Sequence, residues 1–329
     1  GTVDYQLFAL DGKTGTPCPD FGVEGVLTLD PGKPLAIAGE IAISSPPVVI
    51  NDTLVVGSSI LDSYRKDGLS GRVLAFDVKT GAPRWQWDPI PRNPKNPATA
   101  SWHNKSSEIT GSANVWSLIA VDEERDLIFL PTSSPTPDHY GGNRPGNNEY
   151  ANSIVALRGS TGEVVWHYQL VHHDLWDYDV ASPPVLVDLD HQGKTVPAVV
   201  QNTKMGLVFI FNRETGEPLF PIEERPVPQD GIEGEWLSPT QPFPVAPPPL
   251  VTQGITAADA WGFTPLDEYL CEKKINSYRQ GGIYTPPSFN GALMMPAFNG
   301  GANWGGAAVN PDSKVMVAPT ARMPAIIII

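Results

Sequence analysis

A short pattern that returns four times along the chain constrains its fold more than any other feature. Each copy is an apolar strand that ends in a polar residue and is followed by a Thr-Gly pair: Thr14-Gly15, Thr80-Gly81, Thr161-Gly162 and Thr215-Gly216. The last three pairs are followed by the aromatic residues Trp85, Trp166 and Phe220. We interpret each copy as a hairpin whose glycine takes the positive φ of the corner. The aromatic side chain can then pack onto the neighbouring unit.

The copies predict an all-β fold. Repeated four-stranded units around an axis form a β-propeller, and loops of differing length account for the unequal spacing of the copies. The chain has 35 Pro and 31 Gly residues for turns, and its nine Trp residues are more than a disordered chain carries. A β-sandwich with recurrent hairpins is the alternative.

Two stretches depart from this pattern. Residues 217–250 are rich in Pro and acidic residues, which predicts an extended excursion over the surface. Residues 264–279 predict a helix, because Thr264 is an N-cap, Pro265 occupies the first helical position and Asp267 completes a capping box. We expect this helix to be an insertion beside one blade.

Charge and composition exclude several classes of protein. The net charge is −14 and no Lys/Arg cluster interrupts it, so nucleic acid is not an expected partner. No apolar run reaches the ~18 residues of a membrane span. The only cysteines, Cys18 and Cys271, cannot form a CxxC metal site or a haem attachment, and they could pair or stay free. Nucleotide and serine-hydrolase motifs are absent.

The densest cluster of chemically active side chains is the octet HHDLWDYD at residues 172–179. A zinc site is poorly supported, because His172 and His173 are adjacent and would point to opposite faces of a strand, with no cysteine nearby. A structural role is possible, with Trp176 and Tyr178 in the core. As an active site, the octet offers a carboxylate beside a bulky indole, which can be partly desolvated and act as a general base.

Three other segments carry related chemistry. Small residues precede Trp116 in GSANVW (residues 111–116), as a flat ligand stacked on an indole would need. Lys204 stands between a strand and a glycine in a chain poor in cations, although such a lysine alone is more often a solvated turn residue. A strand in the segment 57–62 ends on Asp62. Each segment is weak evidence by itself.

Longer motifs resemble the quinoprotein dehydrogenases that use pyrroloquinoline quinone (PQQ). The resemblance is greatest to the membrane-bound branch that acts on glucose, quinate and polyols. The motifs cover essentially the whole chain: TPDHYGGNRP (136–145), YANSIVAL (150–157), VHHDLWDYD (171–179), PTQPFP (239–244), GIYTPPS (282–288) and NWGG (303–306).

This resemblance implies one β-propeller domain over residues 1–329, eight-bladed in the family and incomplete here at both ends. It implies PQQ and a divalent cation, Ca²⁺ or Mg²⁺, near the axis. The family is periplasmic and attached to the inner membrane, and it passes electrons to ubiquinone. Membrane association here would require segments absent from this chain.

The resemblance also implies the activity. We expect oxidation of an aldose such as glucose to its lactone, with quinate, shikimate or another polyol as alternative substrates. A non-catalytic propeller scaffold of the outer-membrane assembly type is the alternative from another functional class, because it shares the strand-Thr-Gly-Trp repeat. It has no need for the residues that the resemblance assigns to the site.

Those site residues follow from matching the motifs position by position. Asp177 matches the catalytic base, Trp116 the indole that stacks on the quinone ring, and Lys204 the cation at the quinone oxygens. Asn303, followed by Trp304, matches a position that contacts PQQ.

For the metal, Asp62 matches a carboxylate ligand, and Ser134 falls where several relatives place a metal-binding Asn. A hydroxyl is a poorer ligand than an amide oxygen, so Ser134 departs from the family pattern. In the octet, we expect Trp176 to support Asp177. We expect His172, His173 and Asp174 around the pocket, and Tyr178 and Asp179 in structural roles.

Overall fold

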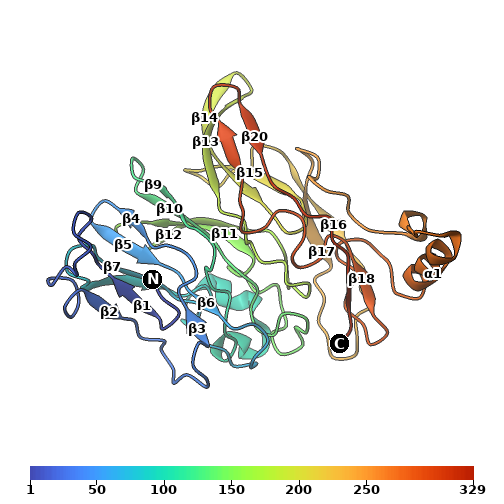
Figure 1. The fold of residues 1–329 in the computed structure, drawn as a ribbon, viewed down its shortest axis with the longest axis horizontal. Coiled ribbons are helices and arrows are strands. Elements are labelled where there is room, and N and C mark those ends of the chain that lie inside the picture. The colour runs from blue at the N-terminus through green and yellow to red at the C-terminus, as the bar shows by residue number, and fades with distance from the viewer.

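The computed structural model describes residues 1–329 and consists of short antiparallel strands joined by long loops (Figure 1). Three 3₁₀ helices interrupt the strands: η1 (Pro97–Ser101), η2 (His103–Glu108) and η3 (Ala257–Asp259). The single α-helix is α1 (Pro265–Asn276). No helix is long and apolar enough to cross a membrane.

The three largest sheets are formed by strands that follow one another along the chain, except that β6 leaves the first of them to pair with β3. The first has the order β4-β5-β7-β8 (Val48–Ile50, Thr53–Val56, Val73–Asp77, Pro83–Trp87). The second has the order β9-β10-β11-β12 (Ala120–Asp122, Leu127–Pro131, Ser153–Arg158, Val164–Gln169). The third is β13-β14-β15 (Val185–His191, Lys194–Asn202, Val208–Asn212). Antiparallel sheets in which each strand pairs with its neighbour in the chain are the blades of a propeller. The prediction of an all-β propeller is therefore confirmed, and the alternative of a β-sandwich is not.

Five two-stranded sheets complete the fold. They are β1-β2 (Gln6–Phe8, Val26–Thr28), β3-β6 (Ile41–Ala42, Ser59–Ile60), β16-β17 (Ile222–Pro226, Thr240–Pro244), β18-β21 (Ala292–Met294, Ala325–Ile327) and β19-β20 (Ala308–Asn310, Val315–Val317). Val309 of β19 and Met316 of β20 pack against the core of the β13-β14-β15 sheet.

The Thr-Gly corners have the predicted positive φ, and two of them are covered by the predicted tryptophans of the preceding units. Gly162 has φ +74°, and a Cβ added there would lie 2.6 Å from the Trp85 ring of the preceding blade. The Trp85 Nε1 donates to Gly159 O at 2.9 Å. Trp166 covers Gly216 of the next unit in the same way, with its Nε1 donating to Arg213 O at 3.0 Å.

The first and last copies differ from this scheme. Phe21, which follows the first Thr-Gly pair, covers Gly81 of the second pair, with its ring 3.4 Å from an added Cβ. A phenylalanine therefore takes the place of the tryptophan in the first copy. Phe220 of the fourth copy instead packs edge-on against His191, with ring centroids 5.3 Å apart.

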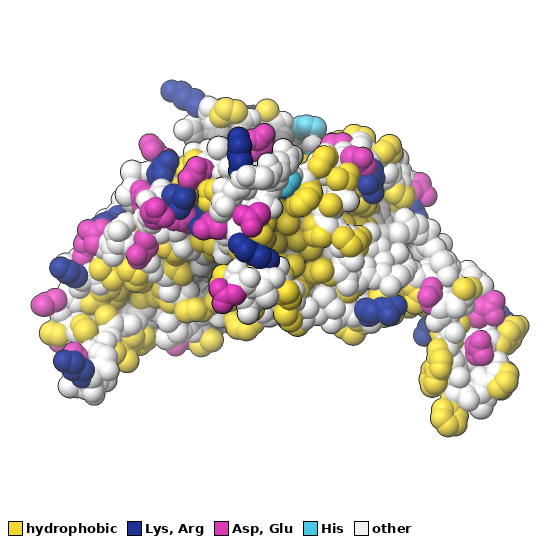
Figure 2. All heavy atoms as spheres, turned by 90° about the horizontal axis from the view of Figure 1, so that it is seen from above, with side chains coloured by type: hydrophobic (Ala, Val, Ile, Leu, Met, Phe, Trp, Pro, Cys, Tyr) yellow, Lys and Arg dark blue, Asp and Glu magenta, His cyan; other side chains and the backbone are white.

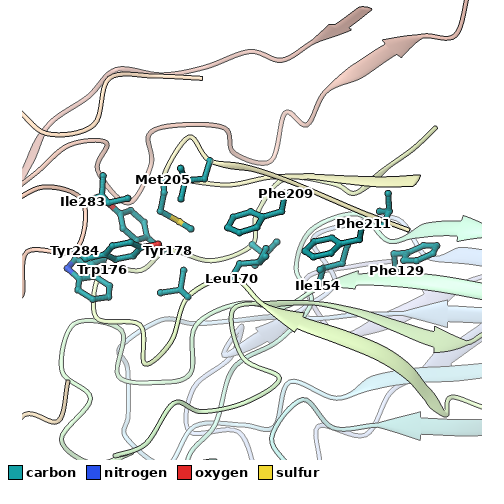
Figure 3. Packing of buried hydrophobic residues seen from close by; sticks show 14 of the residues in the cluster. Phe129, Ile154, Leu170, Trp176, Tyr178, Met205, Phe209, Phe211, Ile283 and Tyr284 are labelled. Atoms are coloured by element: carbon teal, nitrogen blue, oxygen red, sulfur yellow. The ribbon is translucent and has the colours of Figure 1, made fainter. Parts of the chain in front are cut away.

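The main core connects the blades to the octet. Figure 3 shows buried side chains running from Phe129 and Phe211 through Phe209 to Tyr178 and Trp176. Because the octet's aromatic residues belong to the same core cluster as the blade strands, the octet is held by packing as well as by hydrogen bonds.

Two expectations about the irregular stretches need correction. The prediction of a surface excursion over residues 217–250 was wrong in part, because β16 and β17 form a sheet there and Gln241 is buried. The Gln241 amide bonds the backbone N–H and C=O of His172, which ties this stretch to the octet. The helix begins where Thr264 predicted, with the capping box in place, but it ends at Asn276 rather than at residue 279.

Helix α1 stands apart from the body of the molecule. Figure 1 shows it at the far right, and Figure 2 shows the same region as a projecting arm with hydrophobic side chains at its surface. Trp261 and Phe263, which precede the helix, are 75% and 89% exposed. Within α1 only Ile275 is buried.

Candidate active site

Loops from several units meet at a cavity of about 320 Å³. Five of the seven residues assigned from the sequence line it together, although they are spread over residues 62 to 303. The lining residues are Ser59, Ile60, Asp62, Trp116, Asp177, Asp179, Lys204, Phe298, Asn299 and Asn303. A cavity of this size is at the lower end of the roughly 300–1,000 Å³ typical of small-molecule sites.

Lys204 is the cation of this cavity and is only 4% exposed. It lies in the turn between β14 and β15. Its Nζ donates to Asp177 O at 2.7 Å, to Asp177 Oδ1 at 3.2 Å and to Asp179 Oδ2 at 3.1 Å. Burial opposes the charge, but the Asp179 and Asp177 carboxylates outweigh it and raise the pKa of Lys204. The ammonium therefore stays charged.

Asp179 joins Lys204 to the indole. Its Oδ2 also accepts a hydrogen bond from Trp116 Nε1 at 3.1 Å, and its Oδ1 accepts one from Ser134 N at 2.6 Å. The sequence argument placed Asp179 in a structural role and missed its place in the cavity. Its position two residues after Asp177 was the only local signal, and the positive φ of Asp177 means that no strand periodicity applies there.

Asp177 lies at the point where the octet enters the cavity. Its backbone has φ +56°, the left-handed region that only a few residue types adopt readily. Burial raises the pKa of Asp177 well above the usual range, and the Asp179 carboxylate raises it further against the opposing charge of Lys204. A carboxyl group with a raised pKa is suited to exchange a proton near neutral pH.

Asp62 lies across the cavity, after β6. Desolvation raises the pKa of Asp62 to about 7, with further contributions from the charges of Asp138 and Asp179. Asp62 is an exposed residue at the rim, whereas Asp138 next to it is buried, and the Asp138 Oδ2 accepts a hydrogen bond from Ser63 Oγ. The cavity thus has acidic groups on both sides.

The loop after β18 supplies the remaining wall. Gly301 has φ +59°, and an added Cβ would lie 2.0 Å from Lys204 O, so only glycine permits this close approach. Ala302 N donates to Thr203 O at 3.0 Å, which fixes Asn303 beside Lys204. The same loop brings Phe298 and Asn299 to the cavity, and no motif in the sequence singled these two out.

The structure does not bring Ser134 or Trp304 into the cavity. The Ser134 hydroxyl donates to the buried Asp174 Oδ2, and neither residue lines the cavity. Trp304 is half exposed, and its Nε1 donates to Ser45 Oγ at 3.3 Å.

The octet histidines also point elsewhere. His172 bonds Gln169 Oε1 at 2.9 Å and Glu224 Oε1 at 3.1 Å. His173 is buried between Gly146 O at 2.8 Å and Glu235 Oε1 at 3.2 Å, and burial lowers the pKa of His173. No group of three or more His, Cys, Asp or Glu side chains forms a ready-made metal cluster. The octet is therefore not arranged as a zinc site.

The arrangement combines a flat indole, one buried ammonium and carboxyl groups with raised pKa values. The indole offers a stacking face, the ammonium stabilises negative charge on a ligand, and a carboxyl can take up a proton. Such a site suits a flat, electron-accepting ligand and a proton-coupled reaction beside it.

Comparison with known proteins agrees with these features. The family model "Glucose/ethanol/alcohol dehydrogenase, beta-propeller domain" of the PQQ proteins matches residues 1–329. The quinoprotein glucose dehydrogenase of Escherichia coli (strain K12) is 37% identical over 323 residues, which are 98% of this chain and 40% of that protein. The quinate/shikimate dehydrogenase (quinone) of Acinetobacter baylyi is 38% identical over 327 residues, again 98% of this chain and 40% of that protein.

Among solved structures, the quinohemoprotein alcohol dehydrogenase from Comamonas testosteroni superimposes with a TM-score of 0.69 at 23% identity. The alignment covers 98% of this chain and 42% of that one, and it supports the shared fold. The chain spans about 40% of the length of the relatives that it matches.

Proposed function

Because this chain belongs to the PQQ-dependent dehydrogenases with a β-propeller domain, we propose that its cavity holds PQQ and oxidises a hydroxyl group of a sugar or polyol. One observation carries the proposal. Asp62, Trp116, Asp177, Lys204 and Asn303 come from separate segments and line a single cavity.

The chemistry of these residues fits the cofactor. When bound, PQQ supplies an electrophilic ortho-quinone that accepts a hydride. Trp116 would offer its indole face to the flat ring and fix the ring plane. Lys204 would place its ammonium against the quinone oxygens, and Asn303 would offer its side-chain amide.

A divalent cation, Ca²⁺ or Mg²⁺, fits the acidic side of the cavity. Asp62 and Asp179 offer the carboxylate oxygens that these hard cations prefer. We assign Asp62 as the principal ligand, because the Asp179 carboxylate already accepts bonds from Trp116 and Lys204. Ser134 is not assigned, since its hydroxyl donates to Asp174.

Asp177 is the proposed base. A carboxylate oxygen of Asp177 would accept the proton of the substrate hydroxyl. A hydride would leave the carbon that bears this hydroxyl. The raised pKa of Asp177 means that the residue must first lose its own proton. Positive charge close by, from Lys204 and from a cation at Asp62, favours the ionised form.

For the substrate, we propose an aldose such as glucose first, with quinate, shikimate and other polyols as alternatives. Glucose and quinate/shikimate appear in the names of the two relatives. A neutral hydroxyl compound suits the position of the base, because a substrate carboxylate beside Asp177 would be repelled by the Asp177 and Asp179 carboxylates. Electrons would pass to ubiquinone at the periplasmic side of the inner membrane.

The test uses the full-length polypeptide that carries this chain. It would be reconstituted with PQQ and Ca²⁺, desalted, and assayed for dye reduction with glucose, quinate and glycerol. We expect a retained quinone absorbance and turnover that is fastest with glucose. Retained absorbance without turnover on any of the three would remove the substrate proposal, and loss of the absorbance on desalting would favour a non-catalytic propeller.

A further inference from the structure

Asp174 lies three residues before the proposed base and is 1% exposed. Its Oδ1 accepts a hydrogen bond from Trp176 N at 3.0 Å, and its Oδ2 accepts one from Tyr178 N at 2.7 Å. Asn152 Nδ2 donates to Oδ2 at 3.1 Å, and Ser134 Oγ donates to the same oxygen. The carboxylate lines no part of the cavity, yet two of its four hydrogen bonds are to the turn that contains Asp177.

The two backbone bonds hold the chain on either side of Asp177. Trp176 N and Tyr178 N flank that residue, and both are fixed by the one carboxylate. Between them Asp177 takes φ +56°, a conformation that needs support from its surroundings in a residue with a side chain. In this conformation Asp177 presents both its carbonyl oxygen and its Oδ1 to Lys204 Nζ.

The turn also contacts the core through bonds that do not involve the Asp174 carboxylate. Trp176 Nε1 donates to Thr285 O at 2.7 Å, and Tyr178 OH donates to Pro296 O at 2.8 Å. Both rings are buried in the main core. These aromatic anchors keep the turn attached to the body, whereas the local path of the backbone through Asp177 depends on Asp174.

A buried cation stands behind Asp174. Arg144 is fully buried, and its Nη2 donates to Asp174 O and to Pro137 O, at 2.5 and 2.9 Å. Burying a carboxylate is costly unless hydrogen bonds and opposite charge offset the cost, and here four donors and Arg144 offset part of it. A well-packed apolar residue would avoid that cost, but it could not accept two backbone N–H groups at once.

We propose that Asp174 is a positioning residue for the reaction: its carboxylate closes the 174–178 turn and aims the Asp177 carboxylate at Lys204 and into the cavity. The inference rests on the proposed function, because it assigns Asp177 as the base. Asp174 itself touches neither substrate nor cofactor.

The principal test is Asp174→Asn in the full-length protein. An Asn keeps the shape and one acceptor, but its NH₂ group cannot accept from Tyr178 N or Ser134 Oγ. A displacement of the base by about 1 Å costs on the order of 100-fold, so we expect kcat to fall by about that factor. KM for glucose and the affinity for PQQ, followed by Trp fluorescence, should stay within about threefold of the wild-type values, because Trp116 and Asp179 are untouched.

The matched control is Asp122→Asn. Asp122 is also buried and also bound to an arginine, with Arg213 Nη1 at 3.0 Å, but it lies in β9 and does not line the proposed active site. It should lower the melting temperature and leave kcat unchanged. If Asp174→Asn behaves like this control, with a lower melting temperature and normal kcat, the positioning role is refuted.

A double-mutant cycle separates positioning from general loss of structure. If Asp174 acts through Asp177, adding Asp174→Asn to Asp177→Asn should cause no further loss of residual turnover. A full additional loss in the double variant would contradict the proposal. Absence of PQQ-dependent turnover in the wild-type protein would instead defeat the proposed function.

Asn152→Gly is the second variant for testing the positioning role, to be used if Asp174→Asn does not fold. Asn152 has φ +47°, so glycine is tolerated there, and the change removes one donor to Asp174 and one to Tyr178 O. We expect an intermediate fall in kcat, about tenfold, with PQQ affinity preserved. Unchanged kcat in this variant would count against the proposal in the same way.

Discussion

The corner at residues 77–81 and the turn at residues 174–178 both place an aspartate carboxylate over backbone N–H groups that follow it. Asp77 Oδ1 accepts from Lys79 N at 3.0 Å and from Thr80 N at 2.9 Å, on the exposed surface. Asp174 makes the equivalent bonds in the core. The outer corner makes these carboxylate bonds within five residues and adds contacts from Arg84 and Phe21, whereas the inner turn also bonds partners more than a hundred residues away.

The two carboxylates also differ in electrostatics. The Arg84 guanidinium, and the backbone N–H and hydroxyl of Thr80, lower the pKa of Asp77, while burial raises the pKa of Asp174. The outer corner therefore uses an accessible carboxylate whose ionised form is favoured. The inner turn uses a buried carboxylate whose ionised form is disfavoured by burial. The variants below separate these two situations.

The largest effect is expected inside the cavity, with Asp177→Asn. The amide keeps the shape of the side chain but cannot take up the substrate proton, so kcat should fall by roughly 10²–10⁴-fold. PQQ should still be retained, because Trp116 and Lys204 are unchanged. Steady-state kinetics measure kcat, and the quinone absorbance measures the retained PQQ. Full activity in this variant would overturn the assignment of the base.

A comparably large effect on stability is expected at an outer corner, with Gly162→Ala. Gly162 has φ +74°, and the added Cβ would meet the Trp85 ring at 2.6 Å. Left-handed strain costs about 1–2 kcal/mol, and the clash should add about 1–3 kcal/mol. Urea unfolding measures the change, and kcat of the folded protein should not alter.

Gly15→Ala is the matched control for that change. Gly15 occupies the same Thr-Gly corner with φ +72°, but nothing lies within 4 Å of an added Cβ. It should therefore cost only the left-handed strain, about 1–2 kcal/mol. Equal losses in the two variants would show that the docking of Trp85 contributes nothing.

The outer corners could be predicted from the sequence because their determinants are adjacent in the chain. The same holds for the start of α1, where Thr264 and Asp267 satisfy each other's backbone groups. The end of that helix was placed too late, at Arg279, because that residue leaves the helix to bond Asp230 O. No local signal reports such a partner.

The cavity was predictable only through motifs. Asp177 and Lys204 were assigned by resemblance, and their contact depends on folding that spacing does not reveal. Asp179 and Asn299 were missed, since a carboxylate in a crowded turn and an amide beside a glycine have many other uses. Ser134 was assigned to the metal from its position, but its hydroxyl faces Asp174.

A smaller effect is expected from pH, with opposite signs in the two regions. For Asp62, the folded pKa of about 7 exceeds the unfolded value near 3.8, so the folded state binds more protons between these values. Its contribution is favourable below pH ~4 and is lost as pH rises to about 7. The pKa of Asp77 is lowered, so its contribution is present above pH ~4 and is lost on acidification.

Melting temperatures from pH 2 to 8, without added PQQ or cation, test this. Asp62→Asn should flatten the decline between pH 4 and 7, and Asp77→Asn should flatten the loss below pH 4. Wild-type slopes that persist unchanged in both variants would mean that neither carboxylate governs the pH dependence.

The smallest effect is expected at the exposed helix, with Thr264→Ala. The change removes the side-chain oxygen that accepts from Asp267 N, worth about 1 kcal/mol of local helix stability. Because only Ile275 of α1 is buried, the helix can unfold without opening the blades. We therefore expect faster amide exchange in α1 and almost no change in the global unfolding midpoint. A drop in that midpoint as large as that of Gly162→Ala would mean that α1 is coupled to the blades, and that local and non-local stabilisation are less separate than the two turns indicate.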